Sequence, residues 1–396
     1  MTDLTEALKP ELWTVSSNEA LKLFVAEPNG TAINFKPAFT YPVFGDSESI
    51  FGFKNLVIFL CFDHYTFYPF LNVKYDTKLN DEVEEPKDTI MKFLPESTVF
   101  KDEIKWVDAI KNEKETYSIP GTIVGGFESF AIYKIDMKQA AAVELHKRLQ
   151  ILVLLYIEAG SFIDHKDELW DLYVIYDTPN DPEDEPSIVG FVTAYNYWKY
   201  PGASNFDAGI KQSRKKISQF VILPNFQGQS IGSKTYSALY DLWLKDDQIV
   251  EIVVEDPNEH FDDMRDKSDL NRLKSVINLK DINLTKVKSE AWLETFRVEQ
   301  KLEKRQFNRL VEMILLSNFK TFKNLSYKNI RLFIKQRLYN KNKEALLSLE
   351  KPVRLDKLQT AYQTLEEDYY RILNGLNLYP KRPIEEEANS SKRIKV

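Results

Sequence analysis

The feature that most constrains this chain is a strand that runs directly into a turn of small residues and then a helix. Residues 217–223, ISQFVIL, form an apolar run that ends at Pro224. The turn QGQSIG occupies residues 227–232, and a helical pattern runs from 231 to 245. The first turn of a helix has N–H groups without helical partners and a partial positive charge, so it is a natural seat for a pyrophosphate. The pattern therefore indicates either a phosphate-binding turn or a tight connection without a ligand.

The amino-acid sequence of the turn excludes two common phosphate-binding loops. It lacks the GK[ST] ending of a P-loop, and it is not a G-x-G-x-x-G sequence. Gly228 and Gly232 would still let ligand oxygens approach the backbone closely. The turn alone does not separate the two interpretations, so the flanking residues must decide.

Composition limits the kind of protein this chain encodes. Its 396 residues suffice for one large domain or two to three modest ones. A formal net charge of −7 disfavours general nucleic-acid binding and suits basic partners. The single cysteine, Cys61, excludes an intrachain disulfide and fits a reducing compartment. The four histidines show no metal-ligand spacing, so no metal is expected.

No membrane attachment is expected from the sequence. The N-terminal residues carry acids early and have no apolar core segment, so they do not resemble a signal peptide. Apolar stretches such as residues 149–157 are far shorter than the roughly 20 residues of a membrane span. We therefore expect a soluble, intracellular protein.

The character of the chain changes along its length. Residues 1–135 are predicted to mix strands and helices, 136–284 contain the turn, 285–375 are predicted to be helical, and 376–396 are polar and predicted to be disordered. Within these regions, the patterns predict strands at 55–62, 70–75 and 129–135, one long buried helix at 137–163, a hairpin around residues 178–186, a polar loop at 199–216, and a final strand at 249–255.

The order strand, glutamine-rich turn, helix and strand resembles the acetyl-CoA core of the GNAT acetyltransferases, whose turn motif is [RQ]-x-x-G-x-[GA]. Gln227, Ser230 and Gly232 occupy the three defined positions, with Ser230 in place of the expected Gly. Further segments, in the same order, resemble the catalytic subunit of the type B histone acetyltransferase, its fungal members in particular, over roughly residues 8–340. They are FTYPVFGDSESIFGFKNL, LQILVLLYIEAGSFID, GFVTAYNYW, ISQFVILPNFQGQ, IVVEDPNEHFDDMRD and the stretch from Arg305 to Leu315.

This resemblance implies a fold and an activity. The fold is α+β, with a GNAT-type mixed central sheet flanked by helices, an N-terminal α/β domain and a helical C-terminal domain. The activity is acetylation, from acetyl-CoA and without a metal, of lysines in the N-terminal tail of newly made histone H4. The resemblance further implies a role in chromatin and DNA repair, and a location in both cytoplasm and nucleus.

The resemblance also implies which residues contact the cofactor. The backbone of the strand would contact the pantetheine and acetyl groups, the turn would hold the pyrophosphate, and two later residues match further contacts. These positions are Phe220, Val221 and Ile222 in the strand, Gln227, Gly228, Gln229, Ser230, Ile231, Gly232 and Ser233 in the turn, and Asn258 and Lys267 beyond it.

Acetyl transfer to lysine requires a neutral amine, whereas a free lysine has a pKa of about 10.4. A general base is therefore expected, and the resemblance assigns that role to Glu255, at the end of the last strand. Asp256 is predicted to be the N-cap of the next helix, with Pro257 and Glu259 completing the start signal, and could assist catalysis. Glu158 is either a surface residue at a helix end or a second acid near the lysine. Cys61 lies in an apolar strand and is expected to pack in the core.

Substrate and partner contacts follow from the resemblance as well. Asp46, Ser47 and Glu48 match one segment that contacts the histone tail, and Tyr195, Asn196 and Tyr197 match another. The plain alternatives are a turn and a strand with aromatic packing. The family pairs with a WD-repeat histone-binding subunit, for which Lys199–Asp207 is a candidate docking loop or a disordered loop. Basic clusters at 381–382 and 392–395 are either a nuclear import signal or a solvated tail.

Two other functions remain open at this point. One is a GNAT enzyme that acetylates a small amine or polyamine, although the chain is about twice as long as that core requires. The other is a non-catalytic histone-binding scaffold, which Ser230 in place of glycine keeps open.

Overall fold

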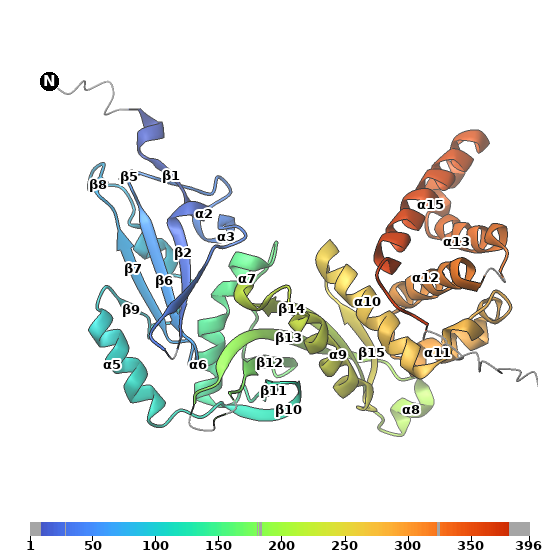
Figure 1. Cartoon of the computed structure of the whole chain (residues 1–396), viewed down its shortest axis with the longest axis horizontal. Coiled ribbons are helices and arrows are strands. Elements are labelled where there is room, and N and C mark those ends of the chain that lie inside the picture. Colours follow the sequence, from blue (N-terminus) through green and yellow to red (C-terminus); the bar gives the residue numbers. More distant parts are fainter. Residues whose placement is uncertain (1–8, 28, 180, 182–183, 323–324, 380–396) are drawn as a thin grey trace, which may run out of the picture. The chain divides into compact units, whose positions relative to one another are not determined.

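The computed structural model describes residues 9–27, 29–179, 181, 184–322 and 325–379. The chain divides into two compact units, Met1–Pro257 and Asn258–Val396. Both large sheets lie in the first unit, whereas the described residues of the second form helices (Figure 1). The basic clusters of the tail lie within residues 380–396, outside the described residues, so the import signal stays a prediction.

The N-terminal part of the first unit is built on a five-stranded sheet of order β3-β2-β6-β7-β9. β2 runs parallel to β6, and β6 runs antiparallel to β7, which confirms two predicted strands. The elements are η1 (Pro10–Leu12), β1 (Thr14–Ser16), α2 (Ser17–Ala20), β2 (Leu21–Ala26), β3 (Ala32–Phe35), α3 (Tyr41–Phe44), β4 (Ser49–Phe51), β5 (Phe53–Lys54), β6 (Val57–Asp63), β7 (Pro69–Lys74), β8 (Thr77–Lys78), α4 (Pro86–Met91), β9 (Val99–Phe100) and α5 (Glu103–Lys114).

The second sheet of this unit has six strands in the order β10-β11-β12-β13-β14-β15. Neighbouring strands are antiparallel except β14 and β15, which are parallel and joined through α9. The predicted hairpin is confirmed as β12 and β13. The elements are β10 (Gly121–Phe127), β11 (Phe130–Ile135), α6 (Ala140–Leu149), α7 (Ile151–Tyr156), β12 (Trp170–Asp177), β13 (Ser187–Lys199), α8 (Ala203–Asp207), β14 (Gln212–Ile222), η2 (Pro224–Phe226), α9 (Ile231–Leu244) and β15 (Ile249–Val254).

One continuous core connects the two sheets of the first unit. Leu60 of the N-terminal sheet, Leu152 of α7 and Val174 of β12 belong to the same cluster of buried side chains. The prediction of a deeply packed apolar helix is correct in its burial and wrong in its extent. Residues 137–163 form two helices, because Gln150 ends α6 and starts α7, and Ile157 leaves helical geometry.

The predicted polar loop at 199–216 is also wrong in part. Residues Ala203–Asp207 form the short helix α8, and β14 begins at Gln212, five residues earlier than the apolar run. Its first five residues are polar or charged, but Lys215 is buried against Tyr173 and Trp243, with its ammonium paired to Asp171. A lysine that is buried because it is paired does not contribute to the hydrophobic pattern of the sequence. The start of β14 therefore could not be predicted from that pattern.

The second unit is a set of helices that buries both apolar and charged side chains. Its elements are α10 (Glu259–Val276), η3 (Leu279–Asp281), η4 (Lys286–Lys288), α11 (Glu290–Glu299), α12 (Lys304–Phe322), α13 (Tyr327–Lys341), α14 (Lys343–Leu347) and α15 (Lys351–Leu373). Apolar side chains such as Leu310, Ile314 and Ile334 are fully buried. The helical character predicted for 285–375 is confirmed, whereas the predicted domain boundaries stay predictions.

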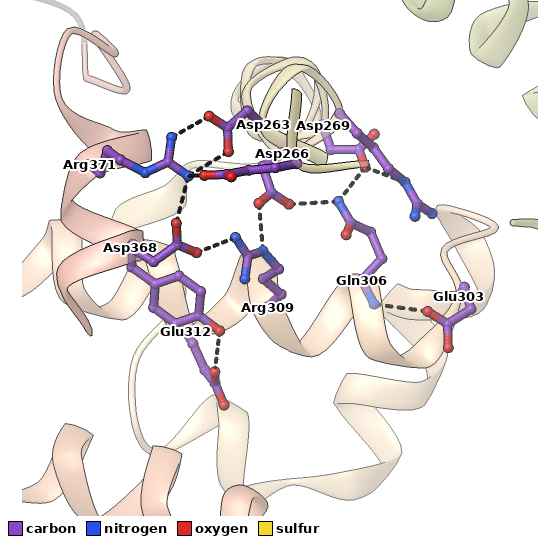
Figure 2. Close-up of polar contacts among 12 residues, drawn as sticks. Asp263, Asp266, Asp269, Glu303, Gln306, Arg309, Glu312, Asp368 and Arg371 are labelled. Carbon is purple, nitrogen blue, oxygen red and sulfur yellow. Dashed lines mark hydrogen bonds and ion pairs between the residues drawn. The ribbon is translucent and has the colours of Figure 1, made fainter. Parts of the chain in front are cut away.

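An ionic network joins α10, α12 and α15 (Figure 2). The Arg309 guanidinium donates to Asp266 at 2.5 Å and to Asp368 at 2.7 Å. Gln306 donates to both Asp266 and Asp269 at 3.0 Å. Burial raises the pKa of Asp266 to about 6, although Arg309 acts in the opposite direction. Asp266 is 1% exposed, so its charge depends on these partners.

We expect Arg309→Met to lower the free energy of unfolding by about 3–5 kcal/mol, because it leaves a buried carboxylate without its cation. Arg371→Met is the matched control, since Arg371 pairs with Asp263 and Asp368 on the same network but is largely solvated. Its loss should be much smaller, because water screens exposed pairs. Urea unfolding measures both, and equal losses would contradict the role given to burial.

Candidate active site

The turn between β14 and α9 has the backbone shape of a ligand-binding turn. Gly228 has φ 74° and Ser230 has φ 62°, so both adopt the left-handed conformation. Ser230 is the N-cap of α9, and its side chain makes no capping hydrogen bond to the helix. The N–H groups of the first turn of α9 are therefore not satisfied by this cap. The motif has Gly at this position because positive φ is required there, and Ser230 adopts that conformation.

The turn is held in shape by its own glutamines. Gln227 Nε2 donates to the carbonyl of Ile222 at 2.7 Å, and Gln229 Nε2 donates to the carbonyl of Asn225 at 3.0 Å. Residues 227–230 are exposed, whereas Ile231 is buried and anchors the helix start. A Cβ atom added at Gly228 would meet no atom within 4 Å, so the space beside the turn is open.

The parallel pairing of β14 with β15 stops before the turn. The last register pair is Ile217 with Val254, and β14 continues to Ile222. Phe220, Val221 and Ile222, the predicted cofactor residues of the strand, therefore lie beyond the paired stretch and lead into the turn. The structure thus brings the two predicted parts of the cofactor site together along one segment, 220–233.

Glu255 follows the last residue of β15 and is bonded to β14 through both its backbone and its side chain. Its N–H donates to the carbonyl of Ile217 at 2.9 Å, which extends the ladder by one residue. Its carboxylate accepts from Lys216 at one oxygen and from the Ser218 hydroxyl at the other. Its side chain is 39% exposed, so the carboxylate remains accessible to solvent.

The contacts of Glu255 determine its charge. Burial by itself would raise the pKa of Glu255, but the hydrogen bonds from Lys216 and Ser218 and the positive charge of Lys216 outweigh it. Its pKa therefore lies below the ordinary value of 4.5. The carboxylate is ionised at neutral pH and can accept a proton there.

The prediction that Asp256 caps the following helix is wrong. α10 starts at Glu259, and the cap is Asn258, whose side-chain oxygen accepts from the N–H of Phe261 at 2.9 Å. Asp256 is exposed and has φ 35°, so it forms the sharp turn after β15 instead. Asn258 and Lys267, the remaining predicted cofactor contacts, belong to the second unit, where Asn258 caps α10 and Lys267 lies within it.

Glu158 lies in the turn after α7, where it is exposed. Two hydrogen bonds fix this turn. The N–H of Ala159 donates to the hydroxyl of Tyr41 at 2.7 Å, and Gln219 of β14 donates to the carbonyl of Ser161 at 2.7 Å. The segment with Glu158 is thus attached to the strand that carries the contacts of Glu255.

The predicted substrate segment 46–48 divides into two roles. Asp46 and Ser47 are exposed. The Glu48 carboxylate instead accepts from the N–H groups of Thr40 and Tyr41, at 2.6 and 3.1 Å, and from Asn18 at 2.8 Å. The hydrogen bond from Thr40 is the largest cause of its lowered pKa. Glu48 therefore stabilises the start of α3, and only Asp46 of the two acids is without a hydrogen bond of this kind.

The predicted substrate segment 195–197 is divided by strand alternation. Tyr195 pairs with Lys216 and Tyr197 with Arg214, so both tyrosines lie on the face of Glu255. Asn196 lies on the other face, where it donates to Asp171 at 2.8 Å and accepts from Lys215 at 2.8 Å. The three side chains do not line one groove.

Sequence reasoning missed Lys216, Ser218, Gln219 and Tyr41, which hold the candidate residues in place. A β-bulge explains part of this omission. Thr193 pairs with Gln219 and Ala194 with Ile217, so Ser218 is an extra residue in β14. In a regular strand, successive side chains alternate between the two faces of the sheet. The extra residue of a bulge breaks this alternation, so the faces cannot be assigned from the sequence alone. The signal available was the polar run KKISQ in an otherwise apolar strand.

Comparisons with known proteins show the family to which this chain belongs. The family model for the N-terminus of the histone acetyltransferase HAT1 matches residues 13–158, and the model for the C-terminal part of fungal HAT1 matches 266–320. Histone acetyltransferase type B catalytic subunits from Debaryomyces hansenii and Candida albicans are 56% and 57% identical, each over 100% of this chain and 98% of the relative. The chain belongs to this family.

The protein is therefore a histone acetyltransferase, and its fold is mixed α+β. A solved glucosamine-6-phosphate N-acetyltransferase from Arabidopsis thaliana is 15% identical over 36% of this chain and 90% of that one, with a TM-score of 0.24. The family assignment rests on the sequence relatives and not on this likeness. No helix among the described residues has both the length and the apolar character needed to cross a membrane.

We expect Ser230→Gly to leave the acetyltransferase as stable as the wild type or up to about 1 kcal/mol more stable, because Gly relieves the left-handed strain. The matched control is Ser237→Gly in the middle of α9, which should lose about 0.5 kcal/mol of helix stability. Thermal unfolding of the variants measures both. A loss at Ser230 equal to the loss at Ser237 would contradict the strain.

Proposed function

We propose that this histone acetyltransferase transfers the acetyl group of acetyl-CoA to lysines in the N-terminal tail of newly made histone H4, with Glu255 as the general base. The observation that carries the proposal is the ionised, accessible carboxylate of Glu255 at the point where β15 leaves β14. It lies beside the strand segment that leads into the open turn before α9.

The residues of the turn fit acetyl-CoA. Residues 227–230 are exposed, the space at Gly228 is open, and the start of α9 offers N–H groups and a positive dipole end to a pyrophosphate. We assign the pyrophosphate to residues 227–233, and the pantetheine and acetyl contacts to Phe220, Val221 and Ile222. Asn258 and Lys267 remain proposed contacts by resemblance. Acetyl-CoA supplies an acetyl group already activated as a thioester.

The proposed reaction is direct attack in a ternary complex. The peptide lysine gives one proton to Glu255, and its neutral amine then attacks the thioester carbonyl. The C–S bond breaks, and the CoA sulfur leaves as a thiol with the second proton of the amine. No acetyl-enzyme is required. Burial raises the pKa of the Cys61 thiol to about 12, with a further contribution from the charge of Glu103. That thiol therefore stays protonated and is a poor nucleophile.

The proposed substrate is complementary in charge to exposed acids of the first unit. The tail of a core histone is basic and extended, and Asp46, Glu158 and Asp256 are exposed acids. The segment that carries Glu158 is bonded to Tyr41 through Ala159 and to the strand β14 through Gln219. Tyr195 and Tyr197 add aromatic surface on the same face as Glu255.

We expect Glu255→Gln to lower kcat on a histone H4 tail peptide by about 10²–10⁴-fold, because it removes the proton acceptor. The assay compares an H4 peptide, an H3 peptide and spermidine with wild-type enzyme, and acetyl-CoA binding by the variant is the control. Full activity of the variant would exclude Glu255 as the base. Activity on spermidine alone would indicate a small-amine enzyme, and binding without turnover would indicate a scaffold.

We also propose that Lys199–Asp207 docks the WD-repeat histone-binding subunit, and that the enzyme works in cytoplasm and nucleus. Trp198, Tyr200 and Phe206 are 59%, 55% and 56% exposed. Their rings form a row, with centroids 6.0 and 5.9 Å apart. Exposed aromatic residues are enriched in protein interfaces.

We expect Phe206→Ala to weaken capture of that subunit by at least tenfold if Phe206 is an anchor. Ile104→Ala in α5 is the control, since Ile104 is an exposed apolar residue, 77% accessible, elsewhere in the first unit. A pull-down with purified subunit measures both. Undiminished capture by the Phe206 variant would remove the loop from the interface.

A further inference from the structure

Both oxygens of the Glu255 carboxylate are occupied by groups of the neighbouring strand. Lys216 Nζ pairs with Oε1, and the Ser218 hydroxyl donates to Oε2. An ionised carboxylate has about four acceptor positions, so roughly two remain. Since the side chain is 39% exposed, a lysine from a substrate can reach a remaining position without displacing Lys216.

The bulge in β14 explains how both groups reach the same carboxylate. Lys216 pairs with Tyr195 and therefore lies on the face of that tyrosine. Ser218, the extra residue of the bulge, lies between the pairs of Ile217 and Gln219. The Glu255 N–H is bonded to the Ile217 carbonyl, so the side chain of Glu255 begins between Lys216 and Ser218.

We propose that Lys216 is a positioning residue for the acetyl transfer, since its ammonium holds Glu255 in place and presents the peptide lysine with a neutral ion pair. This inference rests on the proposed function, in which Glu255 is the base. An isolated carboxylate would stabilise the incoming lysine as an ammonium ion, which cannot attack a thioester. A carboxylate already paired with Lys216 stabilises the ammonium less, and the neutral amine is then easier to form.

A nearby cation acts on both partners of the proton transfer in the same direction. It favours the ionised form of Glu255, whose pKa is lowered in part by Lys216. It also disfavours the charged form of the substrate lysine, because like charges repel. Removing the charge of Lys216 should therefore move both ionisations to higher pH.

The other charged groups near this face do not replace Lys216. Arg214, two residues earlier in β14, pairs with Glu251 of β15. The hydroxyl of Tyr195 on β13 is bonded to Asp167, which raises the pKa of Tyr195. Glu158 after α7 and Asp256 after β15 are exposed acids, so they add to the negative charge and not to the positive.

The test is the pH dependence of kcat for an H4 tail peptide, since kcat reports groups in the enzyme–substrate complex. We expect Lys216→Met to lower kcat at pH 7 by about tenfold and to move the rising limb of the profile to higher pH. KM for the peptide should fall or stay constant, because the free carboxylate binds the ammonium more tightly. Lys216→Arg should restore the wild-type profile.

Three further variants make the outcome decisive. Lys216→Gln keeps a hydrogen-bond donor without the charge, so it should shift the limb as Lys216→Met does. Ser218→Ala keeps the charge but removes a hydrogen bond that lowers the pKa of Glu255, so it should move the limb less than the uncharged Lys216 variants do. Lys245→Met removes an exposed lysine at the end of α9 and should resemble the wild type. A rising limb that stays unmoved in both uncharged Lys216 variants would overturn the inference. Full activity of Glu255→Gln would instead overturn the proposed base.

Discussion

The separation of β14 from β15 is the constraint on which the catalytic half of this structure depends. The two strands pair in parallel as far as Ile217 and Val254, and α9 connects them. Beyond that pair β14 continues toward the turn, whereas β15 ends and the next residue, Glu255, makes the last backbone hydrogen bond to β14. The end of the pairing between β14 and β15 therefore leaves the strand segment proposed for the cofactor and places the proposed base beside it. The bulge at Ser218 adjusts which β14 side chains reach that base.

The sequence predicted the parts of the site that depend on local backbone chemistry. The turn at 227–232, the helix after it and the position of Glu255 at a strand end follow from apolar periodicity and small residues. What it could not predict depends on pairing between distant segments. Lys216 reaches Glu255 across 39 positions of the chain, and the register with β14 decides that Tyr195, and not Asn196, shares the face of Glu255. Asn258 rather than Asp256 caps α10, because the chain needs two further residues to turn after β15.

The fold was predictable to a similar degree. Burial of the apolar stretch 140–156 follows from its composition, while the break at Gln150 has no proline or glycine to announce it. The buried Asp266 and Lys215 read as surface residues in sequence, since a charged side chain is usually solvated. Both are buried because a partner from another element neutralises them, namely Arg309 on α12 and Asp171 on β12. Such pairs are visible only once the elements are in place.

The position of Glu48 affects how kinetic data on this enzyme can be interpreted. Its carboxylate holds Thr40 and Tyr41 at the start of α3, and the hydroxyl of Tyr41 accepts from Ala159 beside Glu158. A substitution at Glu48 can therefore displace an acidic residue on a different segment without touching a peptide. Loss of activity in an alanine scan would then report loop geometry, and a peptide contact should be assigned to Glu48 only from a crosslink or a bound structure.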